Sequence, residues 1–219
     1  MFNVLIASAM LAGVAWCSPG PAPAKKIDSI HATYELARTF KPNQASQAVF
    51  AFDDPQRLHW MFLPGTRAGL PLRDMTPDQR KKLETLLRTV LSERGMQDLE
   101  GIYAMEVALQ EAAKRRGRED PTRDPDQYEF AVFGEAGDDP WAWHFEGHQL
   151  SLNFTHVGDD VTVTPLFIGV APFEIPDGTY KGMQVLGDES DAGFALLGSL
   201  DEEQRAQAII PGRVPGDVH

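Results

Sequence analysis

The stretch WAWHFEGHQLSLNFTH, from Trp141 to His156, holds three of the chain's six histidines and one glutamate. If this run is a β-strand, His144, Glu146 and His148 share one face, because successive side chains of a strand point to opposite sides. Two imidazoles and a carboxylate are ligands that Zn²⁺, Fe²⁺ or Cu²⁺ accepts in proteins. The spacing therefore indicates a candidate site for a divalent transition metal.

The apolar side chains of this run change face at Gly147. They stand at odd positions before the glycine and at even positions after it: Trp143 and Phe145, then Leu150, Leu152 and Phe154. A β-bulge at the glycine would cause this change, and so would a strand that passes from one environment into another. Either explanation puts Glu146 and His148 where the pleat changes, which is a suitable place for a site.

The spacing also leaves other interpretations open. Alternate residues of a strand lie about 6.6–6.8 Å apart, which is wide for one metal ion. A metal site would then need a bulge or a further ligand such as His59. Alternatively, Glu146 and His148 bond to each other or to backbone at the edge of a hairpin, or they serve a metal-free ligand or acid–base chemistry.

Several functional classes are excluded by pattern or charge. The sequence contains no Gly-x-Ser-x-Gly motif, phosphate-binding loop or dinucleotide fingerprint. Ser151 and His148 form no convincing triad without an acid that orients the histidine. A formal charge of −12 opposes binding to nucleic acid or to an anionic membrane surface. We therefore expect a small molecule or an ion as ligand.

The elements that would position these residues follow from periodicity and capping signals. Helices are predicted over about 27–39, 43–47, 76–95, 98–116, 188–200 and 201–210, and strands over 57–62, 128–133, 141–156 and 161–168. Helix 76–95 opens with Thr76-Pro77-Asp78-Gln79, a capping box with proline at the first helical position. Glu106 falls close to the apolar stripe of helix 98–116, and we expect it at the rim of the core. The pattern predicts an α+β fold with helices packed on an antiparallel sheet, which includes a long hairpin from Trp141 to Ile168.

The N-terminus predicts export to the periplasm or the extracellular space. Residues 4–16 form an apolar run too short to cross a bilayer, and Ala22-Pro23-Ala24 supplies a small-x-small cleavage site. We expect a signal peptide and Pro/Ala linker over 1–24, one domain over 25–212 and a tail over 213–219, with no other membrane segment. The bulky Trp16 before Cys17 disfavours a lipid anchor.

Three segments carry a family resemblance. FDDPQRLHWMFLPGTRAGLPLRDMTPDQR, RDPDQYEFAVFG and WHFEGHQLSLNFT resemble the bacterial family described as domain of unknown function 3500, over about residues 39–210. The resemblance implies export and an architecture, without an established activity. The matched positions that it marks as site candidates are Arg57, Trp60, Pro64, Glu146, His148, Ser151 and Asn153.

The chain departs from the family pattern in two ways. It has Gln149 where the family typically shows a second histidine, which weakens a metal site with two histidines. Longer members continue past the helix that begins at Asp201, so we expect a short or C-terminally truncated member. Three functions stay open: a metal-dependent enzyme, a non-catalytic module that binds its ligand through Arg57, Trp60 and the polar face of Gln149, Ser151 and Asn153, and a structural or vestigial domain without metal.

Overall fold

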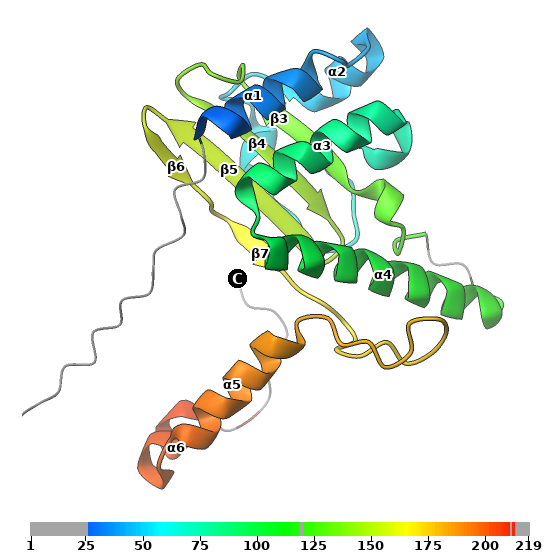
Figure 1. The fold of residues 1–219 in the computed structure, drawn as a ribbon, viewed down its shortest axis with the longest axis vertical. Coiled ribbons are helices and arrows are strands. Elements are labelled where there is room, and N and C mark those ends of the chain that lie inside the picture. The colour runs from blue at the N-terminus through cyan, green and yellow to red at the C-terminus, as the bar shows by residue number, and fades with distance from the viewer. Residues whose placement is uncertain (1–25, 119–120, 211, 213–219) are drawn as a thin grey trace, which may run out of the picture.

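The structure is a computed structural model that describes residues 26–118, 121–210 and 212. It confirms an α+β fold (Figure 1). The α-helices are α1 Lys26–Ala37, α2 Pro42–Ala48, α3 Pro77–Val90, α4 Glu93–Arg115, α5 Gly187–Ser199 and α6 Glu202–Ala208. The strands are β1 Val49–Phe50, β2 Leu70–Pro71, β3 Glu129–Phe133, β4 Trp141–Gly147, β5 Leu150–Val157, β6 Asp160–Thr162 and β7 Leu166–Ile168. Short 3₁₀ turns are η1 Pro55–Leu58, η2 Leu72–Asp74 and η3 Pro125–Gln127.

All seven strands belong to one mixed sheet that is mostly antiparallel. The main path runs β1-β3-β4-β5-β6, with β2 on β3 and β7 on β5. Among the strands that the structure describes, only β1 and β3 pair in parallel. The sheet centre is formed by β3, β4 and β5, which follow one another in the chain.

Helices α1, α3 and α4 cover one face of this sheet (Figure 1). Their apolar stripes pack on the aromatic face of the three central strands. The buried residues include Leu36, Leu83, Leu86, Leu99, Ile102, Met105, Phe130, Trp143, Phe145, Leu152 and Phe154. The Thr76 hydroxyl accepts from the N–H of Gln79, as the capping box predicts, and α3 then ends at Val90. Gly95, which we expected to end the helix, lies instead in the first turn of α4.

The predicted long strand over 141–156 is wrong, because the chain reverses in the middle of it. Gly147 pairs with Leu150, and His148 and Gln149 form a two-residue turn in which Gln149 has a φ of 66°. In this register an even position on β4 faces an odd position on β5. The change of side-chain phase therefore marks a hairpin turn and needs no bulge.

The opposite face of the sheet is covered by irregular chain. The predicted strand over 57–62 is wrong, because η1 ends at Leu58 and no strand follows it there. Residues 60–69, here called the covering segment, contain bends but no helix or strand. The segment lies on the hairpin through the N–H of Gln149, which donates to Phe62 O at 2.8 Å. Phe62 stacks on Phe167 with ring centroids 3.8 Å apart. All seven residues of β4 are buried as a result.

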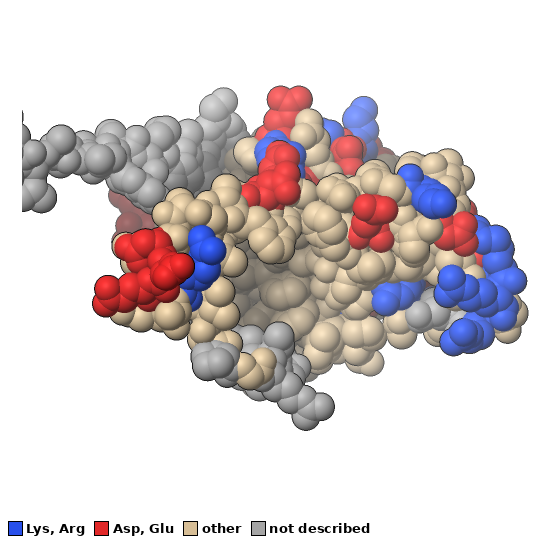
Figure 2. Space-filling model, turned by 90° about the horizontal axis from the view of Figure 1, so that it is seen from below, with Lys and Arg blue, Asp and Glu red and all other residues tan. Residues whose placement is uncertain are grey.

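Helices α5 and α6 stand apart from the sheet (Figure 1). On the face seen from below, acidic side chains gather at one end and basic side chains at the other, around an uncharged hollow (Figure 2). Within residues 26–118 and 121–210, no helix is long and apolar enough to span a membrane. The predicted signal peptide, the cleavage site and Cys17 lie outside the described residues.

Candidate functional site

A polar cluster lies on the sheet face that the covering segment protects. Glu146 on β4 is fully buried and lies opposite Ser151 on β5. Its Oε1 accepts from Ser151 Oγ at 2.5 Å, from the N–H of Met61 at 3.3 Å and from Asn153 Nδ2 at 3.4 Å. Asn153 Nδ2 also donates to Ser151 Oγ at 2.8 Å and to Pro165 O at 2.9 Å. The cluster holds a buried carboxylate among fixed donors.

A second carboxyl stands beside the first. Glu129 on β3 is the register partner of Glu146, so the two side chains share a face of the sheet. Burial raises the pKa of Glu129 to about 7, and the Glu146 charge adds to this rise while Arg67 and Arg73 oppose it. Among the described residues, Oε2 of each glutamate is buried without a hydrogen-bond partner. The pair therefore presents two inward-facing oxygens whose charge is partly balanced by Arg67.

Arg67 organises the covering segment above these carboxyls. Its Nε donates to Met61 O at 3.3 Å, its Nη1 to Gly65 O at 3.2 Å and its Nη2 to Leu63 O. Burial lowers the pKa of Arg67, although Glu146 and Glu129 favour its charged form. The guanidinium thus folds the segment around itself and keeps a positive charge near the glutamates.

His144 lies on β4 two residues before Glu146, opposite Asn153 on β5. Its Nε2 contacts Ala68 O at 2.8 Å, so this nitrogen carries the proton and donates. Burial lowers the pKa of His144 against the opposing influence of Glu146. The ring is therefore neutral at pH 7, with Nδ1 as an acceptor.

A cavity of about 270 Å³ opens next to this cluster. It is lined by Arg57, Leu58, Trp60, Phe133, Ala142, Trp143, His144, Asn153, Phe154, Thr155, Thr164 and Pro165. Arg57 Nε donates to Phe52 O at 2.8 Å, and the guanidinium lies 4.3 Å over the Phe52 ring. Trp60 is 41% exposed and stacks on Phe62. Four candidates from the sequence, Arg57, Trp60, His144 and Asn153, thus line one cavity.

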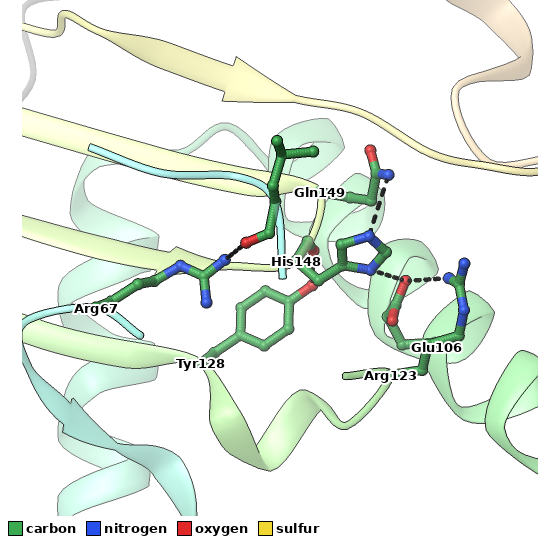
Figure 3. Close-up of polar contacts among 7 residues, drawn as sticks. Arg67, Glu106, Arg123, Tyr128, His148 and Gln149 are labelled. Carbon is green, nitrogen blue, oxygen red and sulfur yellow. Dashed lines mark hydrogen bonds and ion pairs between the residues drawn. The ribbon is translucent and has the colours of Figure 1, made fainter. Parts of the chain in front are cut away.

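His148 lies elsewhere, on the hairpin turn, and contacts α4 (Figure 3). Its Nδ1 is 2.9 Å from Glu106 Oε1, which also accepts from Arg123 Nη1 at 3.2 Å. Glu106 is 1% exposed, so the expectation of a rim position is wrong. The His148 carbonyl accepts from the Tyr128 hydroxyl. Glu146 and His148 therefore belong to different clusters, because the turn separates them.

The close approach of the Tyr128 ring requires a glycine at position 147. A Cβ at this position would lie 2.2 Å from Tyr128 Cδ1, far inside van der Waals contact. The glycine lets the tyrosine pass the hairpin closely enough to hold the turn through the His148 carbonyl. Burial raises the pKa of Tyr128, so the phenol keeps its proton and donates.

The three proposed metal ligands do not converge. His144 and Glu146 face the covering segment, whereas His148 faces α4. His59 is exposed after η1, and Pro64 lies in the covering segment. Within the described ranges, no group of three or more His, Cys, Asp or Glu side chains has the geometry of a metal site.

Sequence analysis missed Arg67, Arg123 and Glu129, and it misplaced Glu106. One signal was present for Glu106, which stands seven residues after the buried Leu99 and so continues the apolar stripe of α4. A glutamate in that phase needs a buried partner. No periodic signal marks Arg67 or Arg123, because both lie in irregular chain.

The fold and the sites together define an α+β protein with a covered sheet face, a ligand-sized cavity and a separate carboxylate–histidine pair. The chain belongs to the family described as protein of unknown function (DUF3500), whose model matches residues 22–219. No curated protein and no solved structure matches the chain.

Proposed function

We propose that the protein is exported and binds a small organic anion in the cavity lined by Arg57, Trp60, His144 and Asn153. The observation that carries the proposal is this cavity, because it gathers a cation, an exposed aromatic ring and polar groups from distant parts of the chain. Its volume of about 270 Å³ is near the lower end of small-molecule sites.

Arg57 supplies the charge that selects an anion. Among the described residues, no carboxylate lies within salt-bridge range of its guanidinium, and one bond to Phe52 O fixes its Nε. An unpaired guanidinium matches the geometry of a carboxylate, which it can bind through two parallel hydrogen bonds. A local cation stands out in a chain whose formal charge is −12.

Trp60, His144 and Asn153 define the rest of the ligand. The Trp60 ring offers an apolar surface for a planar or aliphatic body. Neutral His144 offers Nδ1 as an acceptor, and Asn153 offers its amide oxygen because its nitrogen is already bonded within the Glu146 cluster. We therefore propose a carboxylate that also carries an apolar body and a hydrogen-bond donor.

The buried cluster beneath the cavity keeps this geometry rigid. Glu146, Ser151 and Met61 tie β4, β5 and the covering segment together, so the wall of the cavity is held in place before a ligand arrives. Preorganisation of this kind reduces the entropic cost of binding. Glu146 and Ser151 thus support the site from below and do not line the cavity.

The test is a thermal-shift screen of the purified mature chain with aliphatic, aromatic and hydroxylated carboxylates, followed by calorimetry. We expect a stabilising carboxylate whose affinity falls at least about tenfold in Arg57→Met and Trp60→Ala. The controls are Arg116→Met, an exposed arginine at the end of α4, and Phe173→Ala, which is 42% exposed against 41% for Trp60. A screen without any stabiliser, or equal losses in the controls, would refute the proposal.

Two further measurements test the finer parts. Elemental analysis that finds a stoichiometric transition metal, lost in His148→Ala, would establish a metal site at His148, which lies outside this cavity. Export rests on residues 1–24, and N-terminal sequencing of protein from the cell envelope or the medium should show cleavage after Ala24. Retention of an uncleaved chain inside the cell would contradict export.

A further inference from the structure

Helices α5 and α6 expose large apolar side chains to solvent. Phe194 is 71% exposed and Leu196 is 67% exposed on α5, and Ile210, two residues after α6, is 88% exposed. Neither helix contains a buried residue. Large apolar side chains that stand together on a surface mark interaction sites, whereas single ones do not. The two helices therefore have the composition of an element that is covered by a partner.

Helices of this length also need packing to stay folded. Helix α5 has 13 residues and α6 has 7, and isolated helices shorter than about 12–15 residues are marginal in water. Polar contacts hold them in place: Arg94 pairs with Asp188 and Glu189 at the first turn of α5, and Arg205 of α6 donates to Leu200 O. Exposed ion pairs stabilise a fold only slightly. A partner that buries the apolar side chains would supply the packing that these helices require.

The two helices carry mostly negative charge, which limits the kind of partner. Residues 187–208 contain six acidic side chains and one cation, Arg205. Among the described residues, Asp191, Glu202 and Glu203 have no ion pair. Such a surface repels nucleic acid and anionic membranes and attracts a cationic protein surface.

The C-terminal end of α4 has the matching properties. A cavity of about 280 Å³ opens there, lined by apolar side chains of α4, by Pro176 and by Arg116, Arg118 and Arg123. Within the part of the chain that the structure describes, Arg116 and Arg118 have no carboxylate in salt-bridge range. An apolar cavity with cations around it complements a helix pair that exposes apolar side chains and carboxylates.

The two surfaces lie at opposite ends of one face of the molecule (Figure 2). Helices α5 and α6 form the acidic end, the end of α4 forms the basic end, and the hollow between them is uncharged. A twofold axis in the plane of this face, perpendicular to the line between the ends, brings the acidic end of each copy onto the basic end of the other. Two equivalent contacts then form at once. The face is therefore complementary to itself, as a twofold dimer requires.

We propose that the protein forms a twofold homodimer in which the α5–α6 pair of each copy docks on the cavity at the C-terminal end of α4 in the other. Phe194 and Leu196 pack on the apolar part of the cavity, which is large enough for the Phe194 ring. Glu202 and Glu203 pair with Arg118 at its rim. Each copy thus covers the helices that the other leaves exposed.

The first experiment measures the molar mass of the full purified chain by analytical ultracentrifugation between about 1 and 200 µM. We expect an equilibrium between monomer and dimer. Phe194→Asp places a charge in the apolar contact and should raise the dissociation constant at least about 100-fold. The exposed Phe194 position tolerates this change in the monomer. The matched control is Val157→Asp on β5, where the replaced valine is 53% exposed, and it should dimerise like the wild type.

An exchange of charges tests the pairing itself. Arg118→Glu and the double variant Glu202→Arg with Glu203→Arg should each raise the dissociation constant at least about tenfold, because like charges then meet in both contacts. An equimolar mixture of these two variants should form a heterodimer with an affinity within about threefold of the wild type, since each contact again joins opposite charges. Lys81→Glu, at an exposed lysine of α3 outside both surfaces, is the control and should change nothing.

Hydrogen exchange locates the contact. In the wild type at about 200 µM, amides of α5, α6 and the last turn of α4 should exchange at least about tenfold more slowly than in Phe194→Asp. A chain that stays monomeric over the whole concentration range would overturn the proposal. A dimer that Phe194→Asp leaves intact, or a mixture of charge variants that does not associate, would overturn it as well. These measurements do not involve the Arg57 cavity, so the dimer and the carboxylate site are tested separately.

Discussion

The Glu129 carboxyl provides a quantitative test of the covered sheet face. Its pKa is raised from 4.5 to about 7, chiefly because burial disfavours the charged form. At about 1.4 kcal/mol per pKa unit, this corresponds to about 3.4 kcal/mol of destabilisation once the group is ionised. Glu129 is only partly buried, and screening by solvent reduces the expected effect to about 1–2 kcal/mol.

The sign of the pH dependence follows from proton binding. The folded chain holds the Glu129 proton more tightly than the unfolded chain does. Ionisation of Glu129 therefore lowers the free energy of unfolding. Its cost is absent below pH 4.5, grows as the pH rises, and is fully present above pH 7. Glu129→Gln keeps the shape and stays neutral. The free energy of unfolding of the variant should therefore rise by about 1–2 kcal/mol relative to that of the wild type between pH 4.5 and 7. Above pH 7 it should stay higher by the same amount.

The assay is urea unfolding of both proteins at half-unit steps from pH 4.5 to 8.5. The control is Glu84→Gln on α3, an exposed glutamate paired with Arg88, for which we expect no such rise. A difference between wild type and Glu129→Gln that is constant across this range would refute the reasoning. A free energy of unfolding that rises with pH more in the wild type than in the variant would also refute it.

Two further predictions concern the hairpin. Gly147→Ala places a methyl group 2.2 Å from the Tyr128 ring, so the free energy of unfolding should fall by at least about 2–3 kcal/mol. The control is Gly193→Ala, where an added Cβ meets nothing within 4 Å and the change should be neutral or stabilising. Equal effects of the two substitutions would contradict the packing argument. Ser151→Ala removes a donor from buried Glu146 and should lower the free energy of unfolding by about 1–3 kcal/mol. The loss should fall by more than half when the same substitution is made in Glu146→Gln. Additive losses would show that the two side chains do not interact.

Local signals predicted much of the architecture. Capping residues located the starts of α3 and α6, and apolar periodicity located β3 and most of α4, but it merged β4 and β5 into one strand. These features depend on contacts a few residues apart, which composition and spacing describe well. The phase change at Gly147 was also detected, but its cause was not. A turn without Asn-Gly or Asp-Gly looks like continuous strand, because His148 and Gln149 carry no strong turn signal.

The sites were predicted in part. Arg57, Trp60, His144 and Asn153 were candidates and line one cavity, and Glu146 and Ser151 were candidates and bond to each other. These last two partners lie five residues apart on one hairpin, so sequence alone nearly pairs them. Glu106 and Arg123 lie 42 and 25 residues before His148, and no local pattern links them to it.

The sequence by itself determined the fold class, the main helices and strands, and the residues with chemistry to offer. Only the tertiary structure decided which of those residues meet. The chain reversal at His148 and Gln149 turned three equally spaced side chains into members of two clusters on different sides of the hairpin. The physical reason is that side-chain direction repeats along a strand, whereas proximity across a sheet, a helix layer and an irregular segment depends on packing of the whole chain.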